Sequence, residues 1–207
     1  MKQKRGLITV IMVIIILLAL LTAYNIFRYP AMFRRLPDRS LGEAETEQLK
    51  DEIAAKEGKR VLVAYFSYSG TTRRAAEALS SQTGAALYEI APKEAYSNVY
   101  MQSNMEIRRN SRPELAGTVE NMEDYDIVFV GYPVWFHATP APVNTFLESY
   151  DLAGKLVVPF CTSGGSDISE TIPTFLQSCE GLAVYGENRI SSTGEIEGWL
   201  EELDLNL

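Results

Sequence analysis

The sequence predicts an α/β fold, in which a parallel sheet of five strands is covered by helices on both faces and preceded by a transmembrane helix. Short apolar runs alternate with helical segments between residues 60 and 203, which is typical of consecutive β-α units. Several of these runs are apolar at nearly every position, as expected for parallel strands that are buried on both faces. A long run without charged residues stands near the N-terminus.

That N-terminal run comprises residues 7–27, LITVIMVIIILLALLTAYNIF. As a helix it would be roughly 31 Å long, which is enough to cross the hydrocarbon core of a bilayer. A cleaved signal peptide is the competing interpretation, but the run is long for one and no small-x-small cleavage site follows it. We therefore expect a retained, single-pass anchor that contacts membrane lipid.

Basic residues flank the run on both sides, so the positive-inside bias nearly cancels. They are Lys2, Lys4 and Arg5 before the run, and Arg28, Arg34, Arg35 and Arg39 after it. A short cationic tail is difficult to translocate, which favours the extracytoplasmic face for the folded domain.

The charge of the chain is divided unevenly. Residues 1–42 hold seven of the 19 basic residues and one of the 27 acidic residues. Residues 43–207 therefore hold 12 basic and 26 acidic residues, a net charge of −14. A domain this acidic is not expected to bind nucleic acid through its general electrostatic field.

Composition divides the chain into three parts. We expect an anchor at residues 1–27, a juxtamembrane linker with a spacer helix at 28–59, and the folded domain at 60–207. The linker begins with a stretch rich in Pro and Arg. Good helix formers follow, with Leu49 and Ile53 four positions apart.

The elements expected within the domain alternate along the chain. Strands are expected at 60–67, 85–91, 126–133, 155–162 and 181–190, and helices at 72–84, 142–150, 166–179 and 194–203. The strands are short, apolar and rich in β-formers, and the first helix ends at Gly84. Pro173 is expected to kink the third helix.

Residues 92–125 interrupt this alternation because they lack an apolar period. We expect a long loop with one short helix, and loops of this length often carry function. Its tyrosines and arginines either shape access to a ligand or lie on the surface and pair with local acids; they are Tyr96, Tyr100, Arg108, Arg109 and Arg112.

Three loops that follow predicted strands carry the candidate site, because ligands of open parallel sheets bind at the carboxyl ends of the strands. The first loop consists of Ser67, Tyr68, Ser69, Gly70, Thr71 and Thr72. Its hydroxyls, its backbone N–H groups and the close approach that Gly70 permits suit an anion such as a terminal phosphate. It lacks the Lys of a nucleotide P-loop. The alternative is a plain helix cap followed by two solvated arginines, Arg73 and Arg74.

The other two loops suit the flat part of a ligand. One contains Pro133, Val134, Trp135, Phe136 and His137, and the other contains Thr162, Ser163, Gly164, Gly165 and Ser166. Aromatic side chains in the former either stack on a planar ligand or cover an edge of the core. The latter is small enough to bring backbone groups against a ring edge, or is a flexible turn. Together the three loops describe an elongated ligand with a phosphate at one end and a planar ring at the other.

The three motifs are YFSxSGxT at Tyr65–Thr72, GYPxW at Gly131–Trp135 and TSGGS at Thr162–Ser166. In these motifs the chain resembles the short flavodoxin-like proteins, over residues 60 to 204. The resemblance implies a flavodoxin-like three-layer sandwich with strand order 2-1-3-4-5 and FMN where the strand order reverses.

The resemblance also implies the role of each loop. The phosphate would be held by Ser67, Ser69, Gly70, Thr71 and Thr72, with Tyr68 as a further contact to the ring. The isoalloxazine ring would be lined by Pro133, Val134, Trp135 and Phe136 and closed on its other side by Thr162, Ser163, Gly164 and Gly165.

The residues argue against other activities on this fold. A receiver domain needs acidic residues at the ends of the first and third strands, but these strands end in Ser-Tyr-Ser and Gly-Tyr-Pro. A phosphatase of the C-x5-R type needs an arginine six positions after its cysteine, but Asp167 stands at that position after Cys161. No metal-ligand spacing surrounds Cys161 or Cys179, so we expect no metal. The two cysteines are either buried thiols or, in an exported domain, a pair. The single histidine, His137, is expected to be structural.

We therefore expect an FMN-binding redox protein, in which the flavin takes and returns electrons and no protein residue acts as acid or base. Its partners would be a redox protein, or NAD(P)H and a lipid-soluble quinone of the membrane. The acidic charge should disfavour the reduced, anionic flavin and make it a stronger reductant. The alternative function is a membrane-tethered interaction module that has kept the fold without a redox role.

Overall fold

A parallel sheet lies at the centre of the folded body in the computed structural model, which describes residues 2–33 and 36–207. The strand order is β2-β1-β3-β4-β5, and β6 pairs with β4. The strands are β1 (Val61–Tyr65), β2 (Ala86–Glu89), β3 (Ile127–Pro133), β4 (Leu156–Thr162), β5 (Ala183–Val184) and β6 (Asn188–Arg189). The pairs are parallel. This order confirms the topology that the motifs imply.

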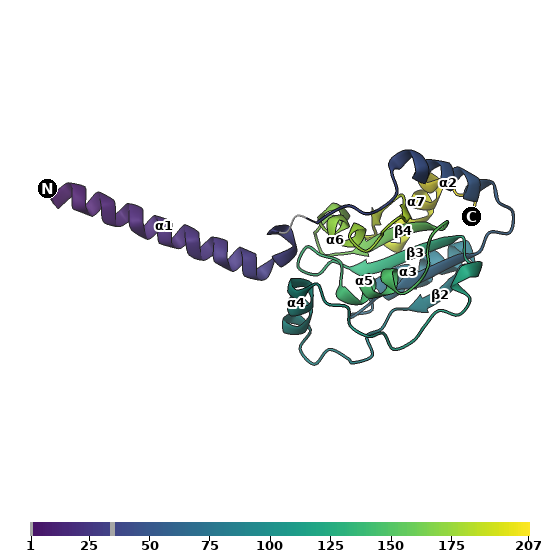
Figure 1. Cartoon of the computed structure of the whole chain (residues 1–207), viewed down its shortest axis with the longest axis horizontal. Helices are drawn as coiled ribbons and strands as arrows, with labels where there is room; N and C mark the ends of the chain where they lie inside the picture. Colours follow the sequence, from purple (N-terminus) through teal and green to yellow (C-terminus); the bar gives the residue numbers. More distant parts are fainter. Residues whose placement is uncertain (1, 34–35) are drawn as a thin grey trace.

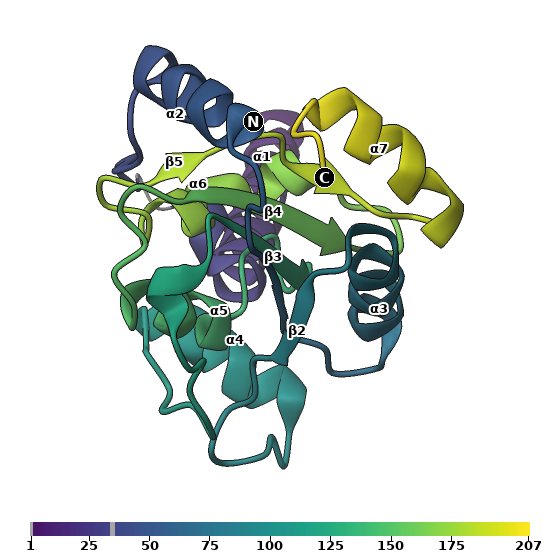
Figure 2. The ribbon, with the colours of Figure 1, turned by 90° about the vertical axis from the view of Figure 1, so that its right-hand side faces the viewer.

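Helices cover both faces of the sheet and complete a three-layer sandwich (Figure 2). One face carries α2 (Glu43–Ala55), α3 (Thr71–Thr83) and α7 (Ile196–Leu203), and the other carries α5 (Ala141–Glu148) and α6 (Ile172–Leu176). Successive strand residues point to opposite faces, so Val63 and Phe129 join the first core while Leu62 and Val128 join the second. Burial on both faces explains why these strands are continuous apolar runs.

The expected last strand, 181–190, is divided into β5 and β6 at Gly186. This glycine has a left-handed backbone with φ of 60°, and a Cβ added to it would lie 2.1 Å from Cδ2 of Leu203. Its carbonyl also accepts a hydrogen bond from Nε1 of Trp199. The break in the strand therefore lets the backbone turn beneath α7.

The expected helix 166–179 is also shorter than the sequence indicates. A 3₁₀ turn at Ile168–Glu170 precedes α6, and Pro173 lies in the first turn of α6. In that position the missing N–H of proline breaks no helical hydrogen bond. Pro173 therefore helps to begin a helix, and the expected kink is wrong.

Helix α2, expected as a spacer, packs on the sheet beside β4 and β5. Ile53 is buried in the core of that face, and Thr46 and Lys50 on the same helix are buried too. The segment before α2 follows the sheet as well, since the Leu41 N–H donates to the carbonyl of Leu182. Part of the residues expected as a linker thus covers the sheet.

The long segment 92–125 folds around one α-helix, α4 (Val99–Arg109), as expected. The side chain of Asn98 caps this helix by accepting a hydrogen bond from the Met101 N–H, and Asn110 ends it in a left-handed conformation. A β-bridge between Pro92 and Leu115 closes the base of the loop.

Helix α1 (Lys2–Arg28) projects from the body, and its C-terminal end lies beside α4 (Figure 1). Residues 8–28 have a mean hydropathy of 2.7 and none of this stretch is buried in the protein. A membrane span has this length and composition, and a signal sequence near the N-terminus passes the same test. A 3₁₀ turn at Pro30–Phe33 follows α1.

Cys161 and Cys179 are both buried and unpaired. Burial raises the pKa of the Cys161 thiol to about 12 and also raises the pKa of the Cys179 thiol. The two residues are therefore unreactive core thiols in this structure.

The packing of Gly131 against Phe160 can be tested by adding one methyl group. A Cβ at Gly131 would lie 2.2 Å from Cζ of Phe160, whose side chain is fully buried and cannot move aside. We expect Gly131→Ala to lower the free energy of unfolding by about 1–3 kcal/mol. Urea unfolding of the full chain in mild detergent measures this change.

Gly198→Ala is the matched control, because nothing lies within 4 Å of a Cβ at this exposed position in α7. Alanine should stabilise the helix there by up to ~1 kcal/mol. Equal effects of the two substitutions would contradict the packing described for β3 and β4.

Candidate functional site

The candidate site lies where β1, β3 and β4 end, and three loops meet there. We call them the first loop (residues 67–72), the second loop (133–140) and the third loop (162–166). The Val134 N–H donates to the carbonyl of Thr162 at 3.1 Å, which joins the second loop to the third. The buried hydroxyls of Thr72 and Thr162 lie 2.8 Å apart and hydrogen-bond, which joins the first loop to the third.

The first loop turns sharply into α3 at Gly70, whose φ of 85° is left-handed. Oγ of Ser67 accepts a hydrogen bond from the Gly70 N–H at 3.1 Å, so this hydroxyl shapes the turn. No side chain caps the start of α3 at Gly70. The first N–H groups of the helix and the exposed hydroxyls of Ser69 and Thr71 therefore form a set of neutral donors that suits an anion.

The two arginines that follow the first loop, Arg73 and Arg74, have different partners. Nη2 of Arg73 is 2.5 Å from Oε1 of Glu89 on β2, so this side chain forms an ion pair with Glu89. Nη2 of Arg74 lies 3.5 Å from Oγ1 of Thr71 and stays beside the loop. Glu89 therefore balances the charge of Arg73 near the positive end of α3.

The second loop makes a tight turn in which Trp135 and Ala138 exchange two backbone hydrogen bonds. Phe136 and His137, between them, have left-handed φ values of 52° and 57°, which are uncommon for residues other than glycine. Nδ1 of His137 contacts the carboxylate of Glu170. Burial opposes ionisation of Glu170, but hydrogen bonds from His137 and the Asp167 backbone outweigh it and lower its pKa.

Trp135 is held by an edge-to-face aromatic cluster. Its ring centroid lies 5.1 Å from that of Phe66, 5.6 Å from Tyr96 and 6.0 Å from Tyr68. The Tyr96 hydroxyl donates to Oε2 of Glu106 on α4 at 2.6 Å. Burial raises the pKa of Glu106 above its usual range, although the bond from Tyr96 opposes the rise. The cluster fixes Trp135 at the wall of a cavity.

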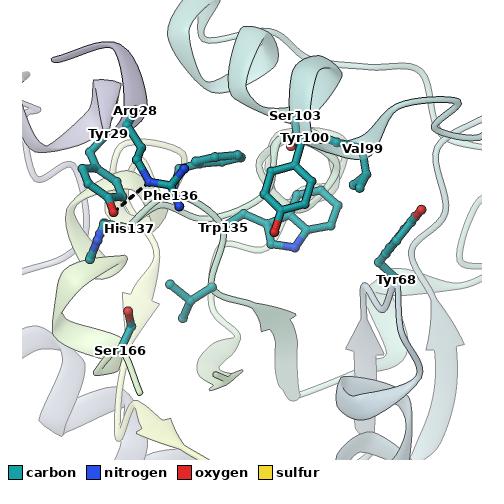
Figure 3. Close-up of a pocket in the computed structure, with 11 residues that line it drawn as sticks. Arg28, Tyr29, Tyr68, Val99, Tyr100, Ser103, Trp135, Phe136, His137 and Ser166 are labelled. Atoms are coloured by element: carbon teal, nitrogen blue, oxygen red, sulfur yellow. Dashed lines mark hydrogen bonds between the residues drawn. The ribbon is translucent and has the colours of Figure 1, made fainter. Parts of the chain in front are cut away.

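This cavity, which we call the ring cavity, has a volume of about 440 Å³, within the range of small-molecule sites. It is lined by Arg28, Tyr29, Tyr68, Val99, Tyr100, Ser103, Val134, Trp135, Phe136, His137 and Ser166. Figure 3 shows Tyr68 on one side of the ring cavity and Arg28, Tyr29 and His137 on the opposite side.

Four of the residues expected to contact the ligand line the ring cavity: Tyr68, Val134, Trp135 and Phe136. The others lie in the adjoining loops outside its lining, namely Ser67, Ser69, Gly70, Thr71, Thr72, Pro133, Thr162, Ser163, Gly164 and Gly165. In the third loop, Oγ of Ser163 accepts from the Gly165 N–H and donates to the Ser166 carbonyl, which keeps the exposed glycines in a compact turn.

Two groups of lining residues were not expected from the sequence. Val99 and Ser103 come from one face of α4, whereas Arg28 ends α1 and Tyr29 follows it. The tyrosines of residues 92–125 offered a partial signal, and Tyr100 does line the ring cavity. Nothing in the sequence indicates that the end of α1 reaches this site.

Two arginines of the same segment, Arg108 and Arg112, have different partners. Arg112 forms a bidentate ion pair with Glu148, in which Nε and Nη2 each donate to one carboxylate oxygen at 2.7 Å. These hydrogen bonds lower the pKa of Glu148. Arg108 instead contacts the end of α1. One of the expected surface pairings is therefore present, at Arg112.

Solved structures resemble the chain over its folded body. A crystal structure of a protein from Bacteroides eggerthii, assigned as a flavoprotein, is 37% identical, with a TM-score of 0.65. The match covers 70% of this chain and 98% of that one. A flavoprotein from Lactobacillus acidophilus, solved in complex with FMN, is 27% identical with a TM-score of 0.58, over 69% of this chain and 99% of that one. None of the curated proteins compared matches the chain.

A family model extends over the same region. The model, described as flavodoxin, matches residues 60–203, which include the sheet, the three loops and α7. This match covers well over half of the chain. The chain therefore belongs to the flavodoxin family.

Proposed function

We propose that the chain binds FMN at the three loops and transfers electrons through the bound flavin as a membrane-tethered redox protein. One observation carries this proposal. Thr162 hydrogen-bonds both to the start of α3, which no side chain caps, and to the second loop, whose aromatic residues line the ring cavity. That arrangement offers donors for a phosphate and a wall for a planar ring, and the similar flavoprotein from Lactobacillus acidophilus was solved in complex with FMN. FMN would supply the electron-transfer chemistry.

Each loop has a proposed part in binding. The first loop would hold the phosphate through the α3 N-terminus and the hydroxyls of Ser69 and Thr71, with Ser67 and Thr72 keeping the loop in shape. Tyr68 and residues 133–136 would bound the ring. Residues 162–165 would approach the ring edge, since the backbone hydrogen bond from Val134 to Thr162 holds the third loop next to the second.

The electron partners follow from where the chain is expected to lie. Helix α1 is long and apolar enough to anchor the domain in a membrane. An anchored domain, which we place on the extracytoplasmic face, meets redox proteins and lipid-soluble quinones at the surface of the bilayer. We propose a quinone-type acceptor, with electrons supplied by a redox protein; NAD(P)H, a cytosolic cofactor, would be the donor for a domain on the cytoplasmic face.

Cofactor content is the direct test of the proposed function. Full-length protein purified in mild detergent should be yellow and should release FMN on denaturation, at close to one FMN per chain by absorbance and chromatography. A colourless protein that takes up no added FMN would contradict the proposal. It would favour an interaction module on the same fold.

Replacing Ser69 and Thr71 together by alanine should weaken FMN binding and leave riboflavin binding nearly unchanged, because only FMN carries a phosphate. Hydrogen bonds to a charged group are worth about 1.5–3 kcal/mol each, so FMN affinity should fall at least about tenfold. Fluorescence titration measures both affinities. Ser81→Ala, an exposed position on the same helix, is the control and should change neither. Equal losses for FMN and riboflavin would place the phosphate elsewhere.

The acidic charge should make the reduced flavin harder to form. The negative field of the domain disfavours added negative charge, so the midpoint potential should lie at or below that of free FMN. Raising the salt concentration should move the potential upward, because salt screens surface charge beyond ~10 Å at 0.1 M. Redox titration at two ionic strengths measures both effects. A potential well above that of free FMN would show that local contacts dominate.

A further inference from the structure

The end of α1 is attached to α4 by hydrogen bonds to its last carbonyls. Nδ2 of Asn104 donates to the carbonyls of Phe27 and Arg28 at 3.4 and 3.2 Å. Nη1 of Arg108 donates to the carbonyls of Ile26 and Phe27 at 3.3 Å, and its guanidinium lies 5.0 Å from the ring centroid of Phe27. Carbonyls at a helix C-terminus need partners outside the helix. Because α4 supplies these partners, it is held beside the end of the apolar run.

The residues that follow α1 make a second contact with the folded body. The ring of Tyr29 packs edge-on against His137 with centroids 4.5 Å apart, and Nε of Arg28 donates to the Tyr29 hydroxyl at 3.0 Å (Figure 3). Ala31 is buried against Ile107 and Ala138. The body is therefore joined to the end of α1 by packed side chains as well as by the chain itself, which limits how far it can turn there.

An apolar cavity between α1 and α4 shows how far along α1 the side chains of α4 reach. It has a volume of about 240 Å³ and is lined by Tyr24, Phe27, Arg28, Tyr100, Met101, Asn104, Met105 and Phe136. Tyr24 and Phe27 belong to the last turns of the apolar run. Side chains of α4 that line the same cavity lie level with those turns. When α1 spans a bilayer, this level is the lipid–water interface, where aromatic and basic residues are typical.

The part of α4 beside this cavity carries exposed apolar side chains. Tyr100 and Met101 are 70% and 67% exposed, which is more than any other large apolar side chain among residues 36–207. A single exposed apolar side chain is common in soluble proteins and needs no explanation. Two adjacent ones at the edge of an apolar cavity point to a surface that another molecule covers. Figure 1 shows that α4 lies on the side of the body from which α1 projects.

The charge of α4 differs from that of the rest of the domain, which is strongly acidic. Arg108 and Arg109 end α4 and are exposed, and no carboxylate within residues 2–33 and 36–207 forms an ion pair with either. The one acidic residue of α4, Glu106, instead accepts a hydrogen bond from Tyr96 of the body. The exposed part of α4 is therefore positively charged, which suits the anionic headgroups of a membrane.

We propose that the α4 surface, formed by Tyr100, Met101, Arg108 and Arg109, is a second membrane contact. Tyr100 and Met101 enter the interfacial region of a phospholipid bilayer, and the two arginines face its headgroups. This inference rests on the membrane tether of the proposed function. A lipid surface fits better than a protein partner, because the hydrogen bonds to α1 keep α4 at the level where the span leaves the bilayer.

The contact has a consequence for the candidate site. Val99, Tyr100 and Ser103 of α4 line the ring cavity, as does Arg28 at the end of α1. With α4 on the bilayer, the ring cavity lies beside the membrane surface in a fixed orientation. Without this contact, α1 would tether the domain but would not orient it.

A fluorescent label on α4 tests the proposal. Met101→Cys in the full-length chain is labelled with an environment-sensitive nitrobenzoxadiazole and placed in nanodiscs of phosphatidylcholine and phosphatidylglycerol. Labelling is selective because Cys161 and Cys179 are buried. We expect emission at shorter wavelength, and an intensity lower by about half or more when the lipids carry a nitroxide near the headgroup, because interfacial helices bury their apolar side ~5–10 Å deep.

Leu87→Cys is the matched control. Leu87 is also an exposed apolar residue, 42% exposed, but it lies on β2 at the far end of the body from α1 (Figure 1). The same label there should be quenched little by the nitroxide lipids. FMN content is measured in the same samples, so that loss of the cofactor is detected separately.

The headgroup contact gives a second readout. Adding Arg109→Glu to the labelled Met101→Cys chain should reduce quenching more in nanodiscs with phosphatidylglycerol than in phosphatidylcholine alone, because only the former repel the new carboxylate. An equal reduction in both lipids would contradict the part assigned to the arginines.

The outcomes separate this inference from the proposed function. Equal quenching at positions 101 and 87, in a chain that stays in the nanodiscs and retains FMN, would overturn the membrane contact of α4 and leave the proposed function standing. A chain that retains FMN but does not enter nanodiscs would contradict the membrane tether, and this inference with it. A chain that is quenched at position 101 but takes up no FMN would support the contact and contradict the redox role.

Discussion

Thr162 at the end of β4 holds the candidate site together. Its hydroxyl bonds to the hydroxyl of Thr72 at the start of α3, and its carbonyl accepts the N–H of Val134 in the second loop. Both bonds are made where water is largely excluded, since Thr72 and Thr162 are buried. Hydrogen bonds of this kind are costly to break because the separated groups would be left without partners. The first loop and the ring cavity therefore keep a fixed position relative to each other.

The sheet makes this arrangement possible by aligning the strand ends. Tyr65 of β1 pairs in register with Gly131 of β3, and Gly131 pairs with Phe160 of β4. Parallel strands that are in register deliver their following loops to one edge of the sheet. Cores on both faces then keep the strands rigid, while the loops are free to carry binding groups. The ring cavity is completed by α4 and the end of α1, which come from outside this alternation.

The local sequence pattern predicted those elements whose residues all lie in the same kind of environment. Strands β1, β3 and β4 are buried on both faces and were recognisable as apolar runs, and α3 was recognisable by its glycine stop. The pattern was misleading where tertiary contacts decide. Gly186 divides the last strand because α7 packs over it, and α2 covers the sheet although its sequence is equally typical of an exposed spacer.

The sequence by itself determined the order of elements, the three loops and their hydroxyl and aromatic content, because these depend on neighbours along the chain. Only the tertiary structure decided that Thr72 is tied to Thr162, that Arg73 pairs with Glu89, and that the end of α1 forms part of the cavity wall. Asn104 reaches the carbonyl of Phe27 from 77 positions away. Contacts between residues so far apart in the sequence depend on how the helices and strands pack together, so a local sequence pattern does not predict them.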